Sequence, residues 1–218
     1  MPHVTKTDLG VMPYDKALDL QRSHFGNVLG GKQSVLLVLE HPNVYTLGKS
    51  GNENNLLVND EFLSKIKATY FKTDRGGDIT FHGEGQIVLY PILNLTELNL
   101  SLREYIEKLE QVVIDTIAHW GIVGERIKTA TGVWIDANNP AKARKIAAIG
   151  VKASRGVTMH GMAFNVKTDL KYFSYINPCG MADKGVTSLE AEGVEIEMNG
   201  IKEMVCQNFA RIFNVELI

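Results

Sequence analysis

Residues 132–165 read GVWIDANNPAKARKIAAIGVKASRGVTMHGMAFN, and three apolar segments follow one another within them. The segments are Gly132-Val-Trp-Ile-Asp136, Lys145-Ile-Ala-Ala-Ile-Gly150 and Val157-Thr-Met-His-Gly-Met-Ala-Phe-Asn165, and each has the length and composition of a strand. Parallel neighbours need a crossover connection of a dozen or more residues, and several links here are too short to hold a helix. The pattern therefore predicts a mixed sheet rather than a purely parallel one.

Strand and helix patterns alternate outward from this region. We expect further strands over residues 34–40, 44–48, 69–73, 79–82, 86–90 and 194–197, and helices over residues 14–29, 61–68 and 102–120, with a last helix capped by Asn199. The clearest helix starts at a capping box formed by Ser101 and Glu104. The fold class that follows is α/β, a mixed β-sheet packed with helices, and we expect residues 1–218 to form one domain.

Composition excludes several classes of function. The chain has 218 residues, 44% of them hydrophobic and 22% charged, and its formal net charge of -2 gives no overall attraction to nucleic acid or to an anionic membrane. The N-terminus lacks the apolar core of a signal peptide, and no apolar run approaches the ~20 residues of a membrane span. We therefore expect a cytoplasmic protein with neither a nucleic-acid nor a membrane partner.

Cysteine usage fits a reducing compartment and does not indicate a metal site. Cys179 and Cys206 stand far apart, with no CxxC and no HExxH motif, so neither a disulfide framework nor a zinc site is indicated. Cys206 lies on the predicted last helix, where packing is the expected role. Cys179 stands between Pro178 and Gly180 in a segment that cannot form a regular element, so we expect it in a turn-rich loop.

A loop thiol can reach a substrate, but a lone cysteine can equally pack as a small hydrophobe, and the segment alone leaves both open. As a nucleophile, Cys179 needs a partner that favours the thiolate. Histidine is the usual partner and lysine is the alternative. Lys145 begins an apolar strand that would partly desolvate its amine and lower its pKa, although without further information a solvated charge at a strand start is the preferred explanation.

Two strands end alike, in Ile79-Thr-Phe-His-Gly83 and Val157-Thr-Met-His-Gly161. Both histidines could face one pocket; taken singly, each is expected to bond a backbone carbonyl. His41, before Pro42, is expected to be a strand-end residue. The run Arg75-Gly-Gly-Asp78 could converge backbone N–H groups on an anion or a carbonyl, although an ordinary tight turn explains it equally well.

Taken together, these stretches resemble the lipoyl(octanoyl) transferases. The resemblance rests on Glu40-His-Pro-Asn-Val-Tyr-Thr-Leu-Gly48, Arg75-Gly-Gly-Asp-Ile-Thr-Phe-His-Gly83, Lys145-Ile-Ala-Ala-Ile-Gly150, Val157-Thr-Met-His-Gly-Met-Ala-Phe-Asn165 and Asn177-Pro-Cys-Gly180, which appear in the family's order. It implies the α/β catalytic fold shared with biotin protein ligases and lipoate protein ligases. One departure is Glu84, where the family commonly has proline, and this affects carrier-protein docking more than chemistry.

The resemblance also implies a reaction. Cys179 would carry an acyl thioester, and Lys145 would lower its pKa and move protons, with no cofactor and no metal. The acyl and pantetheine pocket would be lined by Arg75, Gly76, Gly77, Asp78, Ile79, Thr80, Phe81, His82, Ala148, Ile149, Gly150, His160, Gly161 and Met162. The donor would be octanoyl-acyl carrier protein, and the acceptors would be lipoyl domains of 2-oxoacid dehydrogenase complexes and the glycine cleavage H protein. We expect a monomer.

Three other functions remain compatible with the sequence. A lipoate or biotin ligase would use the same scaffold with ATP and would need no cysteine. An amidotransferase that moves octanoyl between lipoyl-type proteins would differ only in its donor. A non-catalytic module that binds acyl carrier protein would need neither Cys179 nor Lys145.

Overall fold

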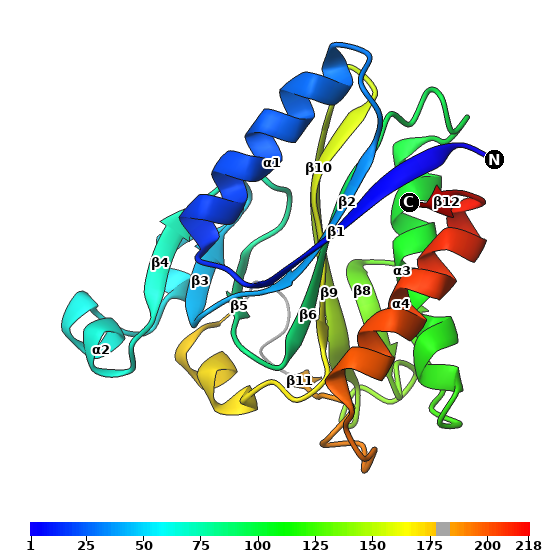
Figure 1. Cartoon of the computed structure of the whole chain (residues 1–218). Coiled ribbons are helices and arrows are strands. Elements are labelled where there is room, and N and C mark those ends of the chain that lie inside the picture. Colours follow the sequence, from blue (N-terminus) through cyan, green and yellow to red (C-terminus); the bar gives the residue numbers. More distant parts are fainter. Residues whose placement is uncertain (178–183) are drawn as a thin grey trace.

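The computed structural model describes residues 1–177 and 184–218, and it places a mixed sheet between helices (Figure 1). Cys179, the predicted nucleophile, lies outside the described residues, together with the proline and glycine that flank it. The predicted turn-rich loop at this position is therefore not tested.

The larger sheet has the order β12-β1-β2-β6-β10-β9-β8-β7 within the described part of the chain, and β11 pairs with β9 outside this path. Its strands are β1 (His3–Val11), β2 (Val35–Glu40), β6 (Gln86–Ile92), β7 (Glu125–Ile127), β8 (Ala130–Ile135), β9 (Arg144–Ser154), β10 (Val157–Asn165), β11 (Gly185–Val186) and β12 (Glu216–Leu217). Pairs β1–β2, β1–β12 and β9–β11 are parallel, and the other pairs are antiparallel. The predicted mixed sheet is confirmed.

The central hairpin joins β9 to β10 through a tight turn. Arg155 and Gly156 both have positive φ, 50° and 78°, which is the conformation that a two-residue hairpin turn requires. The hairpin register pairs Gly161 with Gly150. β9 is longer than the predicted strand, because its pairing with β10 continues to Ser154.

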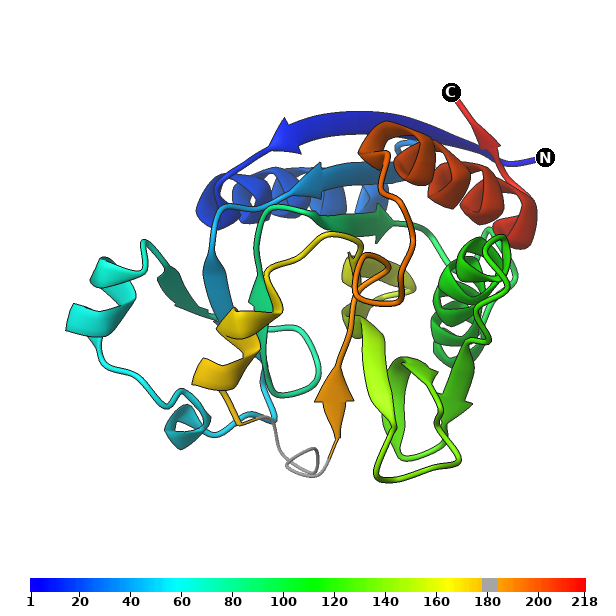
Figure 2. The ribbon, with the colours of Figure 1, turned by 90° about the horizontal axis from the view of Figure 1, so that it is seen from below.

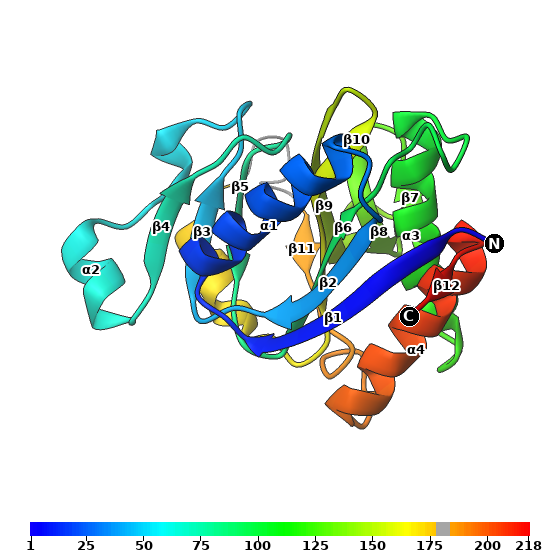
Figure 3. The same ribbon diagram turned by 45° about the horizontal axis from the view of Figure 1, so that its top comes forward.

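A smaller three-stranded sheet, of order β4-β3-β5 in the described residues, stands to one side of the larger one (Figure 3). Its strands are β3 (Val44–Leu47), β4 (Thr69–Lys72) and β5 (Ile79–His82), and the short helices near it are α2 (Asp60–Lys65) and the 3-10 turns η1 (Glu53–Asn55) and η2 (Leu170–Tyr175). Its own apolar cluster is built around Tyr45, Leu63 and Phe81, with the Tyr172 ring stacked on Phe81 at 4.6 Å.

Three long helices cover the two faces of the larger sheet. α1 (Tyr14–Leu29) lies on one face, and α3 (Leu102–Ala118) and α4 (Met198–Phe213) lie together on the other (Figure 1). The predicted capping box of α3 is confirmed, and Cys206 is buried in the core on α4 as expected. None of the helices in the described part of the chain combines the length and apolar character that a membrane crossing requires.

The two ends of the chain meet at one edge of the larger sheet (Figure 2). β1 pairs with β12 in parallel, and His3 stands opposite Glu216. Neither strand was predicted. In β1, half-buried and exposed residues alternate, and Val4 is the one fully buried residue. The strand therefore lacks the apolar run that marks β2.

Two predictions for the region before α4 are wrong. Residues 194–197 form no strand, because no described strand runs beside them, and Val194 and Ile196 pack directly against the core instead. The cap of α4 is Glu197 and not Asn199. The Glu197 carboxylate accepts hydrogen bonds from the backbone N–H groups of Asn199 and Gly200, which places Asn199 inside the first turn.

Candidate functional site

A cavity of about 910 Å³ opens between the two sheets. It is bounded by the loop of residues 75–78, by β5, by β9 and β10, and by the segment joining β7 to β8. Asn177 and Lys184, the residues on either side of the undescribed segment, both line this cavity.

The structure gathers nearly all the other site residues predicted from sequence around this cavity. Those that line it are Lys145, Arg75, Gly76, Gly77, Asp78, Ile79, Thr80, His82, Ala148, Ile149, Gly150, His160, Gly161 and Met162. Phe81 does not line it. Side chains alternate along a strand, and Phe81 points into the apolar cluster of the smaller sheet, where it is 1% exposed.

Lys145 lies half-buried at the start of β9, opposite Trp134 of β8 and Val186 of β11. Its Nζ donates to the Thr131 carbonyl at 3.2 Å and lies 4.7 Å from the centre of the Trp134 ring. Burial lowers the pKa of the Lys145 amine to about 8, and the negative charge of Glu110 acts in the opposite direction. At neutral pH the amine can therefore both lose and regain a proton.

Arg75 is another cation that lines the cavity, and it is firmly anchored. It is 8% exposed, and its guanidinium donates to the Thr46 carbonyl at 2.6 Å, to the Thr46 hydroxyl at 2.9 Å and to the Gly76 carbonyl at 2.9 Å. A guanidinium stays protonated in proteins, so Arg75 holds a fixed positive charge. Its hydrogen bonds tie the glycine-rich loop to the end of β3.

Glycines let the loop of residues 75–78 pass close to the two neighbouring strands. A Cβ at Gly48 would lie 2.2 Å from the Gly77 carbonyl oxygen, and one at Gly150 would lie 2.9 Å from Arg75 Cδ. The Gly76 N–H also donates to the Val151 carbonyl at 2.9 Å. The loop is thus fixed against β9, directly over the cavity.

Buried histidines stand behind Arg75 in a connected network. His82 contacts Gln86 Oε1 through Nδ1 at 2.7 Å and Thr46 Oγ1 through Nε2 at 3.4 Å. Because Gln86 Oε1 only accepts, His82 Nδ1–H is the donor and Nε2 accepts from the Thr46 hydroxyl. Burial lowers the pKa of His82 to about 3, with a smaller contribution from His41, so the ring stays neutral.

His160 lies on the opposite wall, where its Nε2 contacts Asp74 Oδ1 at 2.8 Å. Lys152 Nζ donates to the other Asp74 oxygen at 2.5 Å. Burial acts to raise the pKa of Asp74, but the hydrogen bonds from Lys152 and His160 outweigh it and lower the pKa to about 2. The expectation that each strand-end histidine bonds a backbone carbonyl is therefore wrong for both, since the partners are side chains.

His41 follows β2 directly, as expected of a strand-end residue, and it is fully buried. Its Nδ1 donates to the Met12 carbonyl at 2.7 Å, and its Nε2 accepts from the Tyr90 hydroxyl at 2.7 Å. Burial lowers the pKa of His41 to about 4. His41 therefore supports Tyr90, which lines the cavity, and does not line it itself.

Several cavity residues were not predicted from the sequence. Tyr14 lies at the start of α1, and Tyr90 and Gln86 lie on β6. Their chain segments were assigned correctly, but nothing local indicates which side chains turn towards the cavity. The Lys145 contacts with Thr131 and Trp134 arise from the β8–β9 ladder, and its register cannot be read from either strand alone.

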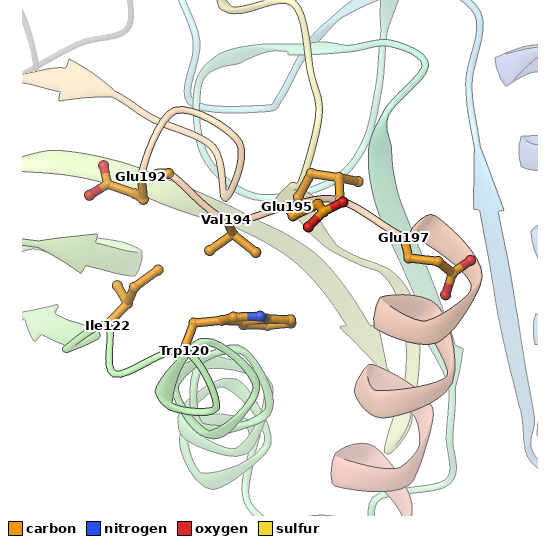
Figure 4. Close-up of a pocket in the computed structure, with 8 residues that line it drawn as sticks. Trp120, Ile122, Glu192, Val194, Glu195 and Glu197 are labelled. Atoms are coloured by element: carbon orange, nitrogen blue, oxygen red, sulfur yellow. The ribbon is translucent and has the colours of Figure 1, made fainter.

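A second hollow of about 660 Å³ lies between the end of α3 and residues 192–197 (Figure 4). Val194 faces the Trp120 ring, while the carboxylates of Glu192 and Glu197 point away from it. Glu192 binds Arg144, and Glu197 caps α4. These side chains are engaged in holding the fold, and none of the predicted site residues lines this hollow. Among the described residues no group of three or more metal-ligating side chains comes together.

Comparison with known proteins shows the family of the chain. The family model described as the lipoyl protein ligase A/B catalytic domain matches residues 13–210. An octanoyltransferase of Bacteroides thetaiotaomicron is 50% identical over 214 residues, which cover 95% of this chain and 94% of the relative.

Solved structures agree at the level of the fold. A bipartite lipoate protein ligase of Thermoplasma acidophilum superposes with a TM-score of 0.77 at 12% identity, over 100% of this chain and 86% of that one. A biotin protein ligase of Aquifex aeolicus gives a TM-score of 0.52 at 12% identity, over 97% of this chain and 69% of that one. The predicted fold is confirmed. With a family model that spans most of its length and a relative that shares half its residues, the chain belongs to the lipoyl protein ligase A/B catalytic domain family, and within it to the octanoyltransferases.

Proposed function

We propose that the chain transfers an octanoyl group from acyl carrier protein to a lysine of a lipoyl domain, through a thioester on Cys179. The observation that supports this most directly is the convergence of chain segments on Lys145. Val186 pairs with Lys145 in the β11–β9 ladder, and Asn177 and Lys184 line the cavity that Lys145 lines.

In the first half-reaction, the neutral Lys145 amine takes the proton of the Cys179 thiol. The thiolate attacks the carbonyl carbon of the octanoyl thioester, and a new carbon–sulfur bond to Cys179 replaces the bond to the pantetheine sulfur. Lys145 returns its proton to the departing sulfur. Backbone N–H groups of the glycine-rich loops are the proposed donors to the transient oxyanion.

In the second half-reaction, the neutral amine of the acceptor lysine attacks the Cys179 thioester. An amide carbon–nitrogen bond forms and the carbon–sulfur bond breaks. Lys145 accepts the proton that the nitrogen loses and passes it to the Cys179 sulfur. The free-energy change of acyl exchange between two thioesters is close to zero, and that of amide formation from a thioester is favourable. The sequence of steps therefore needs no ATP.

We propose that an acyl chain and a pantetheine arm bind in the cavity, against the lining residues named above. Ile79, Ile149 and Met162 offer apolar surface, and Arg75 fixes the loop above them. We further propose that residues 1–218 act as a single catalytic domain, as a monomer in the cytoplasm. The proposed acceptors are lipoyl domains of 2-oxoacid dehydrogenase complexes and the glycine cleavage H protein.

Intact-mass analysis tests the proposal. Incubation with octanoyl-acyl carrier protein should add one octanoyl mass to the chain, and the adduct should be absent in Cys179→Ala and strongly reduced in Lys145→Ala. Lys142→Ala removes an exposed lysine three residues away and should leave the adduct unchanged. ATP-dependent loading of free octanoate without a thioester would overturn the proposal in favour of a ligase. A panel of donors separates acyl carrier protein from octanoylated lipoyl domains, and preference for the latter would indicate an amidotransferase.

A further inference from the structure

One peptide group connects Lys145 to a buried carboxylate on the far side of the sheet. The carbonyl of Thr131 accepts from Lys145 Nζ at 3.2 Å. The N–H of Gly132 belongs to the same peptide group, and it donates to Glu110 Oε1 of α3 at 3.0 Å. The carboxylate, the peptide and the ammonium therefore form one continuous chain of hydrogen bonds.

The backbone at Gly132 is adapted to this arrangement. Its φ of +126° lies in a region that other residues rarely adopt, and a Cβ there would lie 2.5 Å from the Ala147 carbonyl oxygen. The same Cβ would lie 3.4 Å from Lys145 Cε, so glycine also leaves room for the lysine stem. The ladder between β8 and β9 shifts register just after this point, between Val133 and Trp134. In a regular strand the two groups of this peptide would lie in the plane of the sheet and face the strands on either side instead.

Glu110 is an unusual residue for its position on α3. Its neighbours Leu109 and Val113 are fully buried in the core, and Glu110 itself is 6% exposed. Its second carboxylate oxygen accepts from Arg126 Nε of β7 at 2.9 Å. A buried carboxylate costs stability unless its oxygens are satisfied, and here one oxygen serves Arg126 while the other serves the Gly132 N–H.

We propose that Glu110 is a positioning residue for the acyl transfer, and that it orients the Lys145 amine through the Thr131–Gly132 peptide group. The proposal deepens the proposed function and rests on it for the role of Lys145 in catalysis. A carboxylate bonded to the peptide N–H polarises the peptide, and this strengthens the carbonyl as an acceptor for the ammonium. The amine is held at one end of the cavity without a direct ion pair.

The indirect contact matters for proton transfer. A carboxylate in direct contact would stabilise the ammonium form and keep its proton in place. With one peptide group between them, Glu110 orients the amine while burial still holds the pKa of Lys145 at about 8. Among the described residues, the charged groups on the neighbouring elements include Arg126 behind Glu110, Lys184 on the cavity wall, and Arg144, which binds Asp136 and Glu192.

Two variants that change the charge of the Glu110–Arg126 pair in opposite directions test the proposal. Glu110→Gln keeps an acceptor for the Gly132 N–H but removes the negative charge, so the pKa of Lys145 should fall. Arg126→Gln leaves Glu110 in place and removes the positive charge that offsets it, so the pKa of Lys145 should rise. The readout is pH-dependent competitive acetylation with acetic anhydride, followed at the Lys145 peptide by mass spectrometry. Glu107→Gln, an exposed glutamate on the same helix, should leave the midpoint unchanged.

Activity gives a second readout. Glu110→Ala removes the acceptor and should lower kcat by about tenfold or more, while Glu110→Gln should recover most of that loss. The acidic limb of the profile of kcat against pH should move to lower pH in Glu110→Gln and to higher pH in Arg126→Gln. A purely structural role predicts lower thermal stability in both variants with no movement of the limb.

The two proposals can fail separately. Opposite shifts of the Lys145 acetylation midpoint without octanoyl transfer would support the coupling of Glu110 to Lys145 and overturn the proposed function, and with it the catalytic part of the positioning role. Octanoyl transfer with equal acetylation midpoints in wild type, Glu110→Gln and Arg126→Gln would overturn the positioning role alone.

Discussion

Arg75 and Lys145, two of the cations that line the cavity, are held in different ways. Arg75 donates to two carbonyl oxygens and a hydroxyl, and it is almost fully buried. Among the described residues, Lys145 donates only to the Thr131 carbonyl and otherwise faces the Trp134 ring. Arginine keeps its proton and gains rigidity from its fork of donors, whereas a desolvated lysine releases its proton easily. Arg75 thus gives its part of the cavity a fixed shape, and proton transfer is the role proposed for Lys145.

The largest effect at the rigid end is expected from Arg75→Lys. A lysine keeps the charge but cannot reproduce the contacts with both Thr46 and Gly76, so the loop of residues 75–78 should lose its position. We expect kcat/KM to fall by at least about tenfold, since hydrogen bonds to charged groups contribute ~1.5–3 kcal/mol. Steady-state kinetics measure the loss, and Arg155→Lys, at an exposed hairpin position, serves as the matched control. Unchanged kinetics in Arg75→Lys would mean that the guanidinium fork is not what shapes this end.

A smaller effect is expected from Gly150→Ala. The new Cβ would lie 2.9 Å from Arg75 Cδ and 3.0 Å from the Gly76 carbonyl oxygen, so the loop must shift. We expect a loss of about 1–3 kcal/mol in the free energy of unfolding and a higher KM for the acyl donor. Gly26→Ala, in helix α1 with nothing within 4 Å of its Cβ, should instead stabilise the protein by ~0.5–1 kcal/mol. Urea denaturation measures the stability of both variants. If Gly150→Ala were as stable as Gly26→Ala, the loop of residues 75–78 would tolerate displacement.

The smallest effect concerns the histidines behind Arg75. Burial lowers the pKa of His82 to about 3 and of His41 to about 4, below their ordinary value of about 6.5. Between those limits the unfolded chain binds more protons than the folded one, so stability falls as pH falls from about 6.5 towards 4. His82→Gln should reduce this slope by about 1 kcal/mol per pH unit, and His119→Gln, at an exposed position, should not. Denaturation midpoints from pH 7 to 4.5 measure the slope, and an unaltered slope in His82→Gln would show that His82 titrates normally.

Elements that are fixed by local patterns could be predicted from the sequence, and elements that depend on distant partners could not. The capping box at Ser101 and the strand of residues 157–165 follow from local patterns, so both were found. β1 was missed because only Val4 is fully buried and its partners, β2 and β12, are distant in sequence. Residues 194–197 have the alternation of a strand, but a strand also needs a neighbour, and a local pattern contains no information about one.

Site residues could likewise be predicted where a local pattern marks them, and not where distant packing brings them together. A lowered pKa of Lys145 was one of two alternatives for the strand that it begins, and its burial in the structure favours that alternative over a solvated charge. Its partners Glu110 and Trp134 were not found, because they reach it through helix packing and a shifted ladder. Phe81 was assigned to the pocket through resemblance, although the alternation of β5 turns it into the core.

The account depends on Lys145 lowering the pKa of the Cys179 thiol, and the pH dependence of alkylation tests this most directly. Iodoacetamide labelling of Cys179, followed by peptide mass spectrometry, should show a midpoint below the ~8.5 of a free thiol in the wild type. Lys145→Ala should raise that midpoint, and Lys142→Ala should not. Burial raises the pKa of Cys206 to about 11, so Cys206 should stay unlabelled and provides an internal check. A Cys179 midpoint that is the same with and without Lys145 would contradict the account.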